Sequence, residues 1–163
     1  MGISRREVVK RLMAAVAAGV VVPSIVGAAD WKPIFLNAKQ DELLVGVAET
    51  VVPGSGAARV NRFVDLLLSV DSPERQKAFV SSLAAVDEVS RSQFQKPFAE
   101  LSGGEREKVI ASLSKSHKEA FGNLKEWIVE AYYSSEVGMK ELGWDGNFAF
   151  DKYPTCEAVE GHS

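Results

Sequence analysis

The sequence predicts an all-α fold: a small helical domain of about five to six helices with an irregular aromatic C-terminal tail, after an N-terminal signal peptide. From Leu36 onward the apolar residues recur at helical rather than strand spacing. Ile and Thr, which favour strands, number only five after the signal. The chain has 163 residues, 46% apolar and 25% charged, which suits one modest domain with an appendage.

The first 29 residues have the order of a secretory signal. A basic segment is followed by an apolar run, Leu12–Val22, and by small residues at positions 27–29 that suit a signal peptidase. We therefore divide the chain into a signal peptide at 1–29 and a helical domain at 30–163. The alternative is an uncleaved membrane anchor, because Leu12–Ala29 provides 18 mostly apolar residues. Pro23 and the Ala/Gly/Val composition favour cleavage.

The basic part of this signal reads SRREVVK at positions 4–10. It resembles the twin-arginine export signal, with Arg5, Arg6 and Lys10 as the export residues. This resemblance implies passage through the twin-arginine translocase after folding, a route used by proteins that acquire cofactors or partners in the cytoplasm.

The charge of the chain is unevenly distributed. Residues 1–28 carry four bases and one acid, which leaves 15 bases and 21 acids in the remainder. An acidic body without a basic stripe is poorly suited to the phosphate backbone, so nucleic acid is not an expected partner. Neighbouring carboxylates such as Asp87 and Glu88 are expected to lie on solvated helix faces.

Capping residues predict where the first three helices begin and end. Asn37 with Gln40 forms a capping box for a helix that runs to Pro53. Ser72 as N-cap and Pro73 as the first helical residue begin the third helix. The expected apolar face of the first helix is Leu43, Leu44, Val47 and Val51. That of the second is Val60, Phe63, Val64, Leu67 and Leu68, and that of the third is Phe79, Leu83 and Val86.

Pro97 is expected to end the third helix, and Ser102 with Glu105 forms a capping box for the fourth. A fifth helix is expected from about Ser116 to Tyr133, and a short sixth from Ser134 or Ser135. The expected core residues here are Phe98 and Leu101 in the connection, Val109, Ile110 and Leu113 in the fourth helix, and Phe121, Leu124, Ile128 and Ala131 in the fifth.

The sequence offers few residues for chemistry. His117, Cys156 and His162 are the only His and Cys residues, so we expect no metal site, covalent haem or iron–sulfur cluster. His117 lies close to Ser114 and Ser116, but nothing locates the orienting carboxylate or oxyanion hole that nucleophilic catalysis needs. We expect a surface histidine, no catalytic residue and no cofactor bound by this chain.

Four segments near the C-terminus carry a family resemblance: Tyr132–Gly138, Lys140–Trp144, Gly146-Asn147, and Tyr153-Pro154 with Cys156. They resemble the C-terminal motif of the gluconate 2-dehydrogenase subunit 3 family. Three earlier segments also resemble that family's pattern, namely Glu49–Pro53, Phe63–Asp65 and Lys96–Leu101. The resemblance covers most of residues 36–156.

The resemblance implies a noncatalytic small subunit of a periplasmic dehydrogenase. Its expected partner is a large subunit that contains FAD and oxidises a sugar, sugar acid or polyol, often accompanied by a multihaem cytochrome c subunit. The small subunit would escort the flavoprotein through the twin-arginine route and stabilise it. The complex would lie at the periplasmic face of the inner membrane, peripheral or anchored.

The expected partner interface follows the C-terminal motif. It comprises Ser135, Glu136, Gly138, Trp144, Asn147, Phe150, Tyr153 and Cys156. Two roles stay open for the tail aromatics: closing the domain's own core or anchoring the partner. Two roles also stay open for Cys156, a buried thiol or an intersubunit disulfide with the flavoprotein.

A second function of another class also fits the sequence. The chain would then be an independent exported helical binding module, held at the membrane by an uncleaved signal, with a small ligand between its helices. A neighbouring gene for a large flavoprotein without its own signal would favour the accessory subunit over this module.

Overall fold

The computed structural model describes residues 31–144, and every regular element within that range is a helix. The α-helices are α2 (Ala38–Val51), α3 (Val60–Val70), α4 (Pro73–Phe94), α5 (Gly103–Ser116), α6 (Lys118–Tyr133) and α7 (Glu136–Glu141), with a 3-10 turn, η1 (Phe98–Glu100), between α4 and α5. The predicted all-α class is confirmed. None of these helices is both long and apolar enough to cross a membrane.

The predicted capping boxes are formed. In α2 the Asn37 side chain accepts a hydrogen bond from the Gln40 backbone at 2.9 Å, and the Gln40 side chain accepts one from the Asn37 backbone at 3.0 Å. In α5 the Glu105 carboxylate accepts from the backbone N–H of Ser102 at 2.8 Å. Each box satisfies amide groups that a helix start leaves unpaired, which explains why local sequence located these starts.

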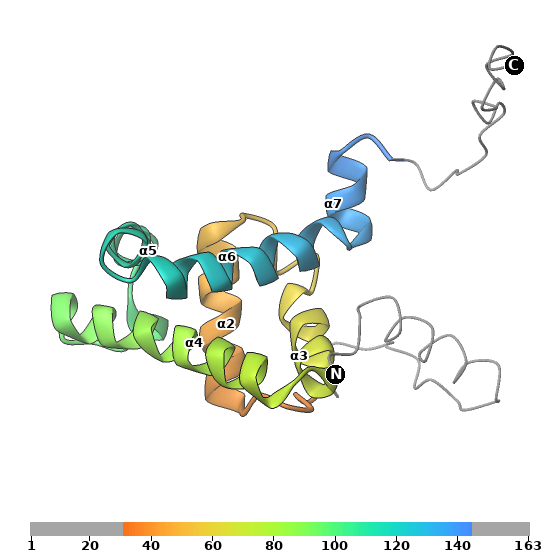
Figure 1. Ribbon diagram of the computed structural model, residues 1–163. Coiled ribbons are helices and arrows are strands. Elements are labelled where there is room, and N and C mark those ends of the chain that lie inside the picture. Colours follow the sequence, from red (N-terminus) through yellow and green to blue (C-terminus); the bar gives the residue numbers. More distant parts are fainter. Residues whose placement is uncertain (1–30, 145–163) are drawn as a thin grey trace, which may run out of the picture.

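The helices pack around α2, as Figure 1 shows. Helices α4 and α6 lie side by side, and α2 crosses them and contacts α3, α4, α5 and α6. Helix α5 packs against α4 and α6 at one end of the molecule, and α3 packs against α6 at the other. The short α7 contacts the C-terminal end of α6 and projects beyond the rest of the bundle.

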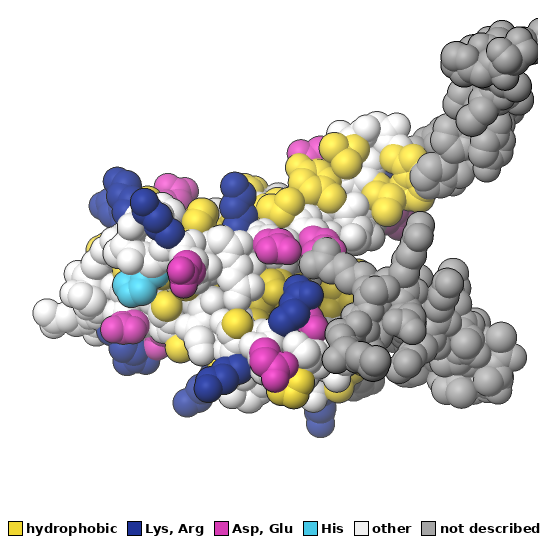
Figure 2. All heavy atoms as spheres, viewed as in Figure 1, with side chains coloured by type: hydrophobic (Ala, Val, Ile, Leu, Met, Phe, Trp, Pro, Cys, Tyr) yellow, Lys and Arg dark blue, Asp and Glu magenta, His cyan; other side chains and the backbone are white. Residues whose placement is uncertain are grey.

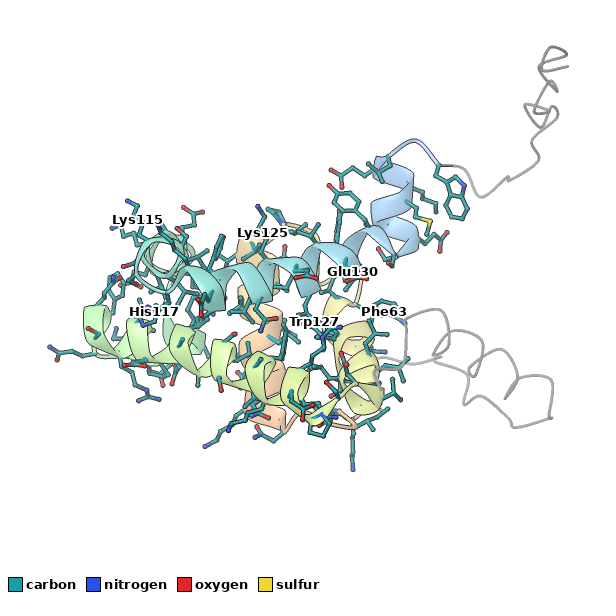
Figure 3. The ribbon with its side chains drawn as sticks, in the orientation of Figure 1. Phe63, Lys115, His117, Lys125, Trp127 and Glu130 are labelled. Atoms are coloured by element: carbon teal, nitrogen blue, oxygen red, sulfur yellow. The ribbon has the colours of Figure 1, made fainter. Side chains whose placement is uncertain are left out.

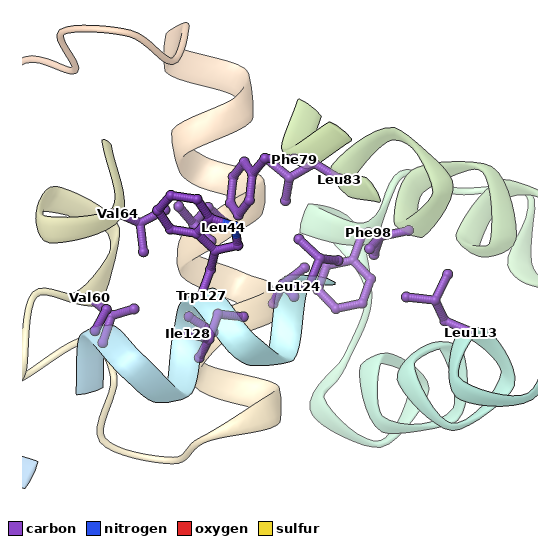
Figure 4. Packing of buried hydrophobic residues seen from close by; sticks show 14 of the residues in the cluster. Leu44, Val60, Val64, Phe79, Leu83, Phe98, Leu113, Leu124, Trp127 and Ile128 are labelled. Atoms are coloured by element: carbon purple, nitrogen blue, oxygen red, sulfur yellow. The ribbon is translucent and has the colours of Figure 1, made fainter. Parts of the chain in front are cut away.

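The core brings together apolar side chains from every helix but α7, with η1 included (Figure 4). Phe98 of η1 is fully buried, and Leu101 is buried after it, as expected from the connection. The ring of Trp127 meets that of Phe79 edge-on at 5.7 Å between centroids, and the Arg75 guanidinium lies 5.0 Å from the Trp127 ring centre. Sequence reasoning missed Trp127, although it follows the core residue Leu124 by one helical turn.

Two sequence expectations were wrong in detail. Phe63 was expected in the core, but it is 37% exposed, because α3 turns Val60, Val64 and Leu68 inward and Phe63 lies off that face. Asp87 was expected to be solvated, but its carboxylate accepts from the Phe98 backbone at 3.0 Å and from Arg91 at 2.9 Å. It thereby fastens η1 to α4.

A buried carboxylate fastens the first described residues to α3. Asp65 is fully buried, and it accepts hydrogen bonds from the backbone N–H groups of Ile34 at 2.6 Å, Phe35 at 3.1 Å and Leu36 at 2.7 Å. Three donors of this kind replace the water that burial removes from a carboxylate. The chain therefore enters the domain along α3.

Candidate functional site

Four of the predicted site residues lie together around α7: Ser135, Glu136, Gly138 and Trp144. The others, Arg5, Arg6, Lys10, Asn147, Phe150, Tyr153 and Cys156, lie outside the described residues. The structure therefore places only the part of the predicted interface that adjoins the end of α6.

Ser135 forms the junction between α6 and α7. Its hydroxyl donates to the Tyr132 carbonyl at 2.5 Å and accepts from the backbone N–H of Gly138 at 3.1 Å, which caps α7. Gly138 is buried against α6, and a Cβ atom at this position would overlap the carbonyl group of Tyr132. A residue without a side chain is required here because the two helices approach closely.

Glu136 and Trp144 take different positions at this junction. Glu136 is exposed and pairs with Lys140 one turn later at 2.8 Å; this hydrogen-bonded ammonium lowers the pKa of the Glu136 carboxyl. Trp144 is half-buried, and its backbone N–H donates to the carbonyl of Met139 at 3.0 Å. This hydrogen bond fixes the backbone of Trp144 against the C-terminal end of α7.

Tyr132 connects the two helices through its side chain. It is buried, and its hydroxyl donates to the Glu141 carboxylate at 2.9 Å. This bond raises the pKa of Tyr132 above its ordinary value, because the hydroxyl must keep its proton to donate. Glu141 is thereby held over the C-terminal end of α6.

Glu49 organises the turn that follows α2. Its two carboxylate oxygens accept from the backbone N–H groups of Gly54 and Gly56, each at 2.9 Å, and these bonds lower the pKa of Glu49. Gly54 has a positive φ of 93°, which glycine adopts without strain. The Glu49–Pro53 segment of the family pattern therefore serves as the base of a rigid turn.

These two parts of the chain meet in space. A Cβ atom on Gly54 would lie 3.4 Å from the Tyr132 hydroxyl, so the turn after α2 lies directly against the end of α6. We call this region the C-terminal corner, defined as Glu49–Gly56 together with Tyr132–Trp144. It unites two segments that the sequence separates by more than seventy residues.

Apolar side chains are exposed on the C-terminal corner. Figure 2 shows them gathered over α7, next to the point where the described residues end. Leu142 is 69% exposed, and Tyr133 and Val137 are each 38% exposed. The ring of Tyr133 meets that of the buried Tyr132 edge-on at 5.2 Å, which limits its movement. We call these three residues the corner surface.

Two further polar side chains of residues 31–144, His117 and Asp41, make local hydrogen bonds. His117 is exposed, as expected, at the break between α5 and α6, and its Nδ1 lies 2.8 Å from the Ser116 hydroxyl. No group of three His, Cys, Asp or Glu residues in this range could hold a metal ion. Asp41 is hydrogen-bonded to Asn61 at 2.8 Å, and burial raises its pKa.

One open groove lies between α2, α4 and η1. It has a volume of about 560 Å³ and is lined by the apolar side chains of Leu43, Val80 and Leu83 and by charged residues that include Lys39 and Glu42. Asp87 also lines it, but its carboxylate already binds Arg91 and the Phe98 backbone. The groove lies apart from the C-terminal corner.

Sequence reasoning missed several residues of the corner. Glu49, Tyr132 and Glu141 belong to segments that carry the family resemblance, but only the fold shows that they bind one another or the turn. The corner surface was not foreseen either, although apolar residues in a short capped helix at the end of a domain are a usable signal.

Comparison with known proteins supplies one match. A family model described as Gluconate 2-dehydrogenase subunit 3 matches residues 38–148, which is more than half of the chain. Neither the curated proteins nor the solved structures contain a significant match. The matched range includes α2 through α7 and thus both segments of the C-terminal corner.

Proposed function

Because the chain belongs to the gluconate 2-dehydrogenase subunit 3 family, it is an accessory subunit of a dehydrogenase complex, and we propose that it exports and stabilises the flavoprotein of that complex. The flavoprotein holds FAD and oxidises a sugar, sugar acid or polyol in the periplasm. This chain binds no cofactor itself and performs no redox step. A multihaem cytochrome c subunit receives the electrons, and the twin-arginine translocase carries the folded pair across the inner membrane.

The corner surface is the observation that carries the docking part of this proposal. Buried contacts at Tyr132, Ser135 and Gly138 hold α7 in one position, and the exposed apolar residues of the corner surface lie on this firm base. Preorganised apolar side chains favour binding, since less conformational freedom is lost on association. We propose that the flavoprotein covers this surface together with the aromatic tail, including Asn147, Phe150 and Tyr153.

The export part of the proposal rests on the N-terminal sequence. The pair Arg5 and Arg6, with Lys10 and the apolar run that follows, has the pattern that the translocase reads. A flavoprotein bound to this chain before export would cross the membrane with it. The complex then stays at the periplasmic face of the inner membrane.

Co-expression with an FAD-containing dehydrogenase subunit of the same genome tests the proposal. The variant Arg5→Lys/Arg6→Lys preserves charge but removes the arginine pair. We expect it to leave the flavoprotein and its activity in the cytoplasmic fraction, whereas the wild-type chain delivers both to the periplasm. The matched control is Arg91→Lys, which makes the same exchange at an exposed position of α4.

The two parts of the proposal fail separately in this experiment. Flavoprotein activity that reaches the periplasm equally with both chains would overturn the export role. A flavoprotein that does not copurify with the wild-type chain would overturn the docking role.

The groove between α2, α4 and η1 supports the second candidate, an exported module that binds a small ligand. The groove is lined by both apolar and charged side chains, which suits a ligand that has an apolar part and a charged part. Purified full-length protein that gains thermal stability with a sugar or sugar acid, in the absence of any partner, would favour this function.

A further inference from the structure

Helix α3 has a second apolar face that points away from the core. Phe63, Leu66 and Val70 recur at helical spacing and share this face, which we call the α3 stripe. Phe63 is 37% exposed and Val70 is 53% exposed. Figure 3 shows Phe63 on the side of α3 away from the core residue Trp127. An exposed helix with apolar residues on two faces is unusual unless one face has an occupant.

The charged side chains of α3 leave the stripe uncharged. Asp65 is buried and used by the backbone of residues 34–36. Arg62 lies 5.2 Å from the ring centre of Trp31, which holds the guanidinium beside the incoming chain. Arg62 and Leu66 are four residues apart and therefore neighbours on the helix surface, so Trp31 lies at the border of the stripe.

The apolar run Leu12–Val22 reaches this place. Only eight residues separate it from Trp31, and eight extended residues span about 27 Å. The run is therefore within reach of the stripe, which extends over the eight residues from Phe63 to Val70.

We propose that the α3 stripe binds the apolar run Leu12–Val22 of the same chain while residues 1–29 remain attached. A tethered segment has an effective local concentration in the millimolar range, so it competes well against a second copy or a membrane. The contact removes both apolar surfaces from water and leaves Arg5 and Arg6 outside it. The timing of this contact, before export, rests on the proposed function. The contact itself requires only that residues 1–29 are still attached to the domain.

Thiol labelling of the full-length protein tests this contact. With Cys156→Ser as background, Val70→Cys places one thiol on the stripe, and Val45→Cys places one on α2 at 40% exposure as a matched control. Each is compared with the same chain carrying Val16→Asp/Val20→Asp, which makes the run polar. We expect the mutated run to speed labelling at position 70 about tenfold and to leave position 45 unchanged.

Three results would overturn the contact: equal labelling at position 70 with either run, protection that grows with protein concentration, or protection that requires lipid vesicles. The second indicates a second copy and the third a membrane as the occupant. Circular dichroism verifies that each variant is folded, and the variant Phe63→Ser with the thiol at position 70 gives the reciprocal test, in which we expect faster labelling. The assay uses purified protein without flavoprotein or translocase, so it does not depend on the export role.

Discussion

The carboxylate of Asp65 accepts a hydrogen bond of 2.7 Å from the backbone N–H of Leu36, 29 residues earlier in the chain. Two further backbone donors, from Ile34 and Phe35, complete its environment. This side chain fixes where the N-terminal segment joins the folded domain. The segment that precedes the domain therefore starts from a defined point beside α3.

We expect Asp65→Asn to destabilise the protein by about 1–3 kcal/mol, because the amide has one acceptor oxygen and leaves buried N–H groups unpaired. Urea unfolding followed by circular dichroism measures the change. Asp71→Asn is the control, since Asp71 is only half-buried and its ion pair with Arg75 is a partly exposed contact within one helix turn. Equal losses of unfolding free energy for the two variants would contradict the role of Asp65 in fastening residues 34–36 to α3.

Gly138→Ala is expected to destabilise the corner by about 1–3 kcal/mol, because the added Cβ must push α7 away from the Tyr132 carbonyl. Binding to the flavoprotein should weaken with it. Gly122→Ala is a matched control in the exposed middle of α6, where a Cβ meets no atom within 4 Å. We expect that exchange to stabilise the protein by roughly 0.5–1 kcal/mol.

The lowered pKa of Glu49 predicts that the stability of the protein depends on pH. Its pKa is lowered in the folded protein by the backbone bonds from Gly54 and Gly56, relative to an ordinary value of 4.5. The folded state thus favours the charged form, and the stabilisation is present above pH 4.5 and is lost as the pH falls through the folded pKa.

Urea unfolding of wild type and Glu49→Gln between pH 6 and pH 3 isolates this contribution. Other carboxyl groups titrate in both proteins, so only the difference in unfolding free energy matters. We expect that difference to be largest near pH 6 and to shrink towards pH 3. A difference that is independent of pH would show that the carboxylate charge does not matter to the turn.

Leu142→Asp should weaken binding of the flavoprotein about tenfold, or ~1.4 kcal/mol, because a charge then lies in the contact instead of an apolar side chain. Titration of the purified subunits by calorimetry measures it. Val45→Asp, on α2 and 40% exposed, controls for a general effect of an added charge. Unchanged affinity with Leu142→Asp would remove the corner surface from the interface.

One of the two roles left open for Cys156, the intersubunit disulfide, predicts a covalent link between the subunits. We expect the purified periplasmic complex to run as one joined band on non-reducing gels and as two bands after reduction. The Cys156→Ser complex should give two bands under both conditions. Two separate bands from the wild-type complex, with Cys156 open to alkylation, would overturn the intersubunit disulfide.

Local sequence determined much of this fold. Helix starts at Asn37, Ser72 and Ser102 were readable because a cap joins groups three residues apart. For the last helix the sequence left Ser134 and Ser135 open, and the cap is Ser135. Most core positions followed from helical periodicity, since Val60, Val64 and Leu68 must share one side of any helix.

The tertiary structure alone decided where a helix departs from its periodic pattern and which distant groups meet. Periodicity placed Phe63 in the core, but the packing of α3 on α2 and α6 left it on a second face. The meeting of Glu49–Gly56 with Tyr132–Trp144, and the burial of Asp65, depend on contacts between residues tens of positions apart. Such contacts form only once all the helices are packed, so no local pattern in the chain specifies them.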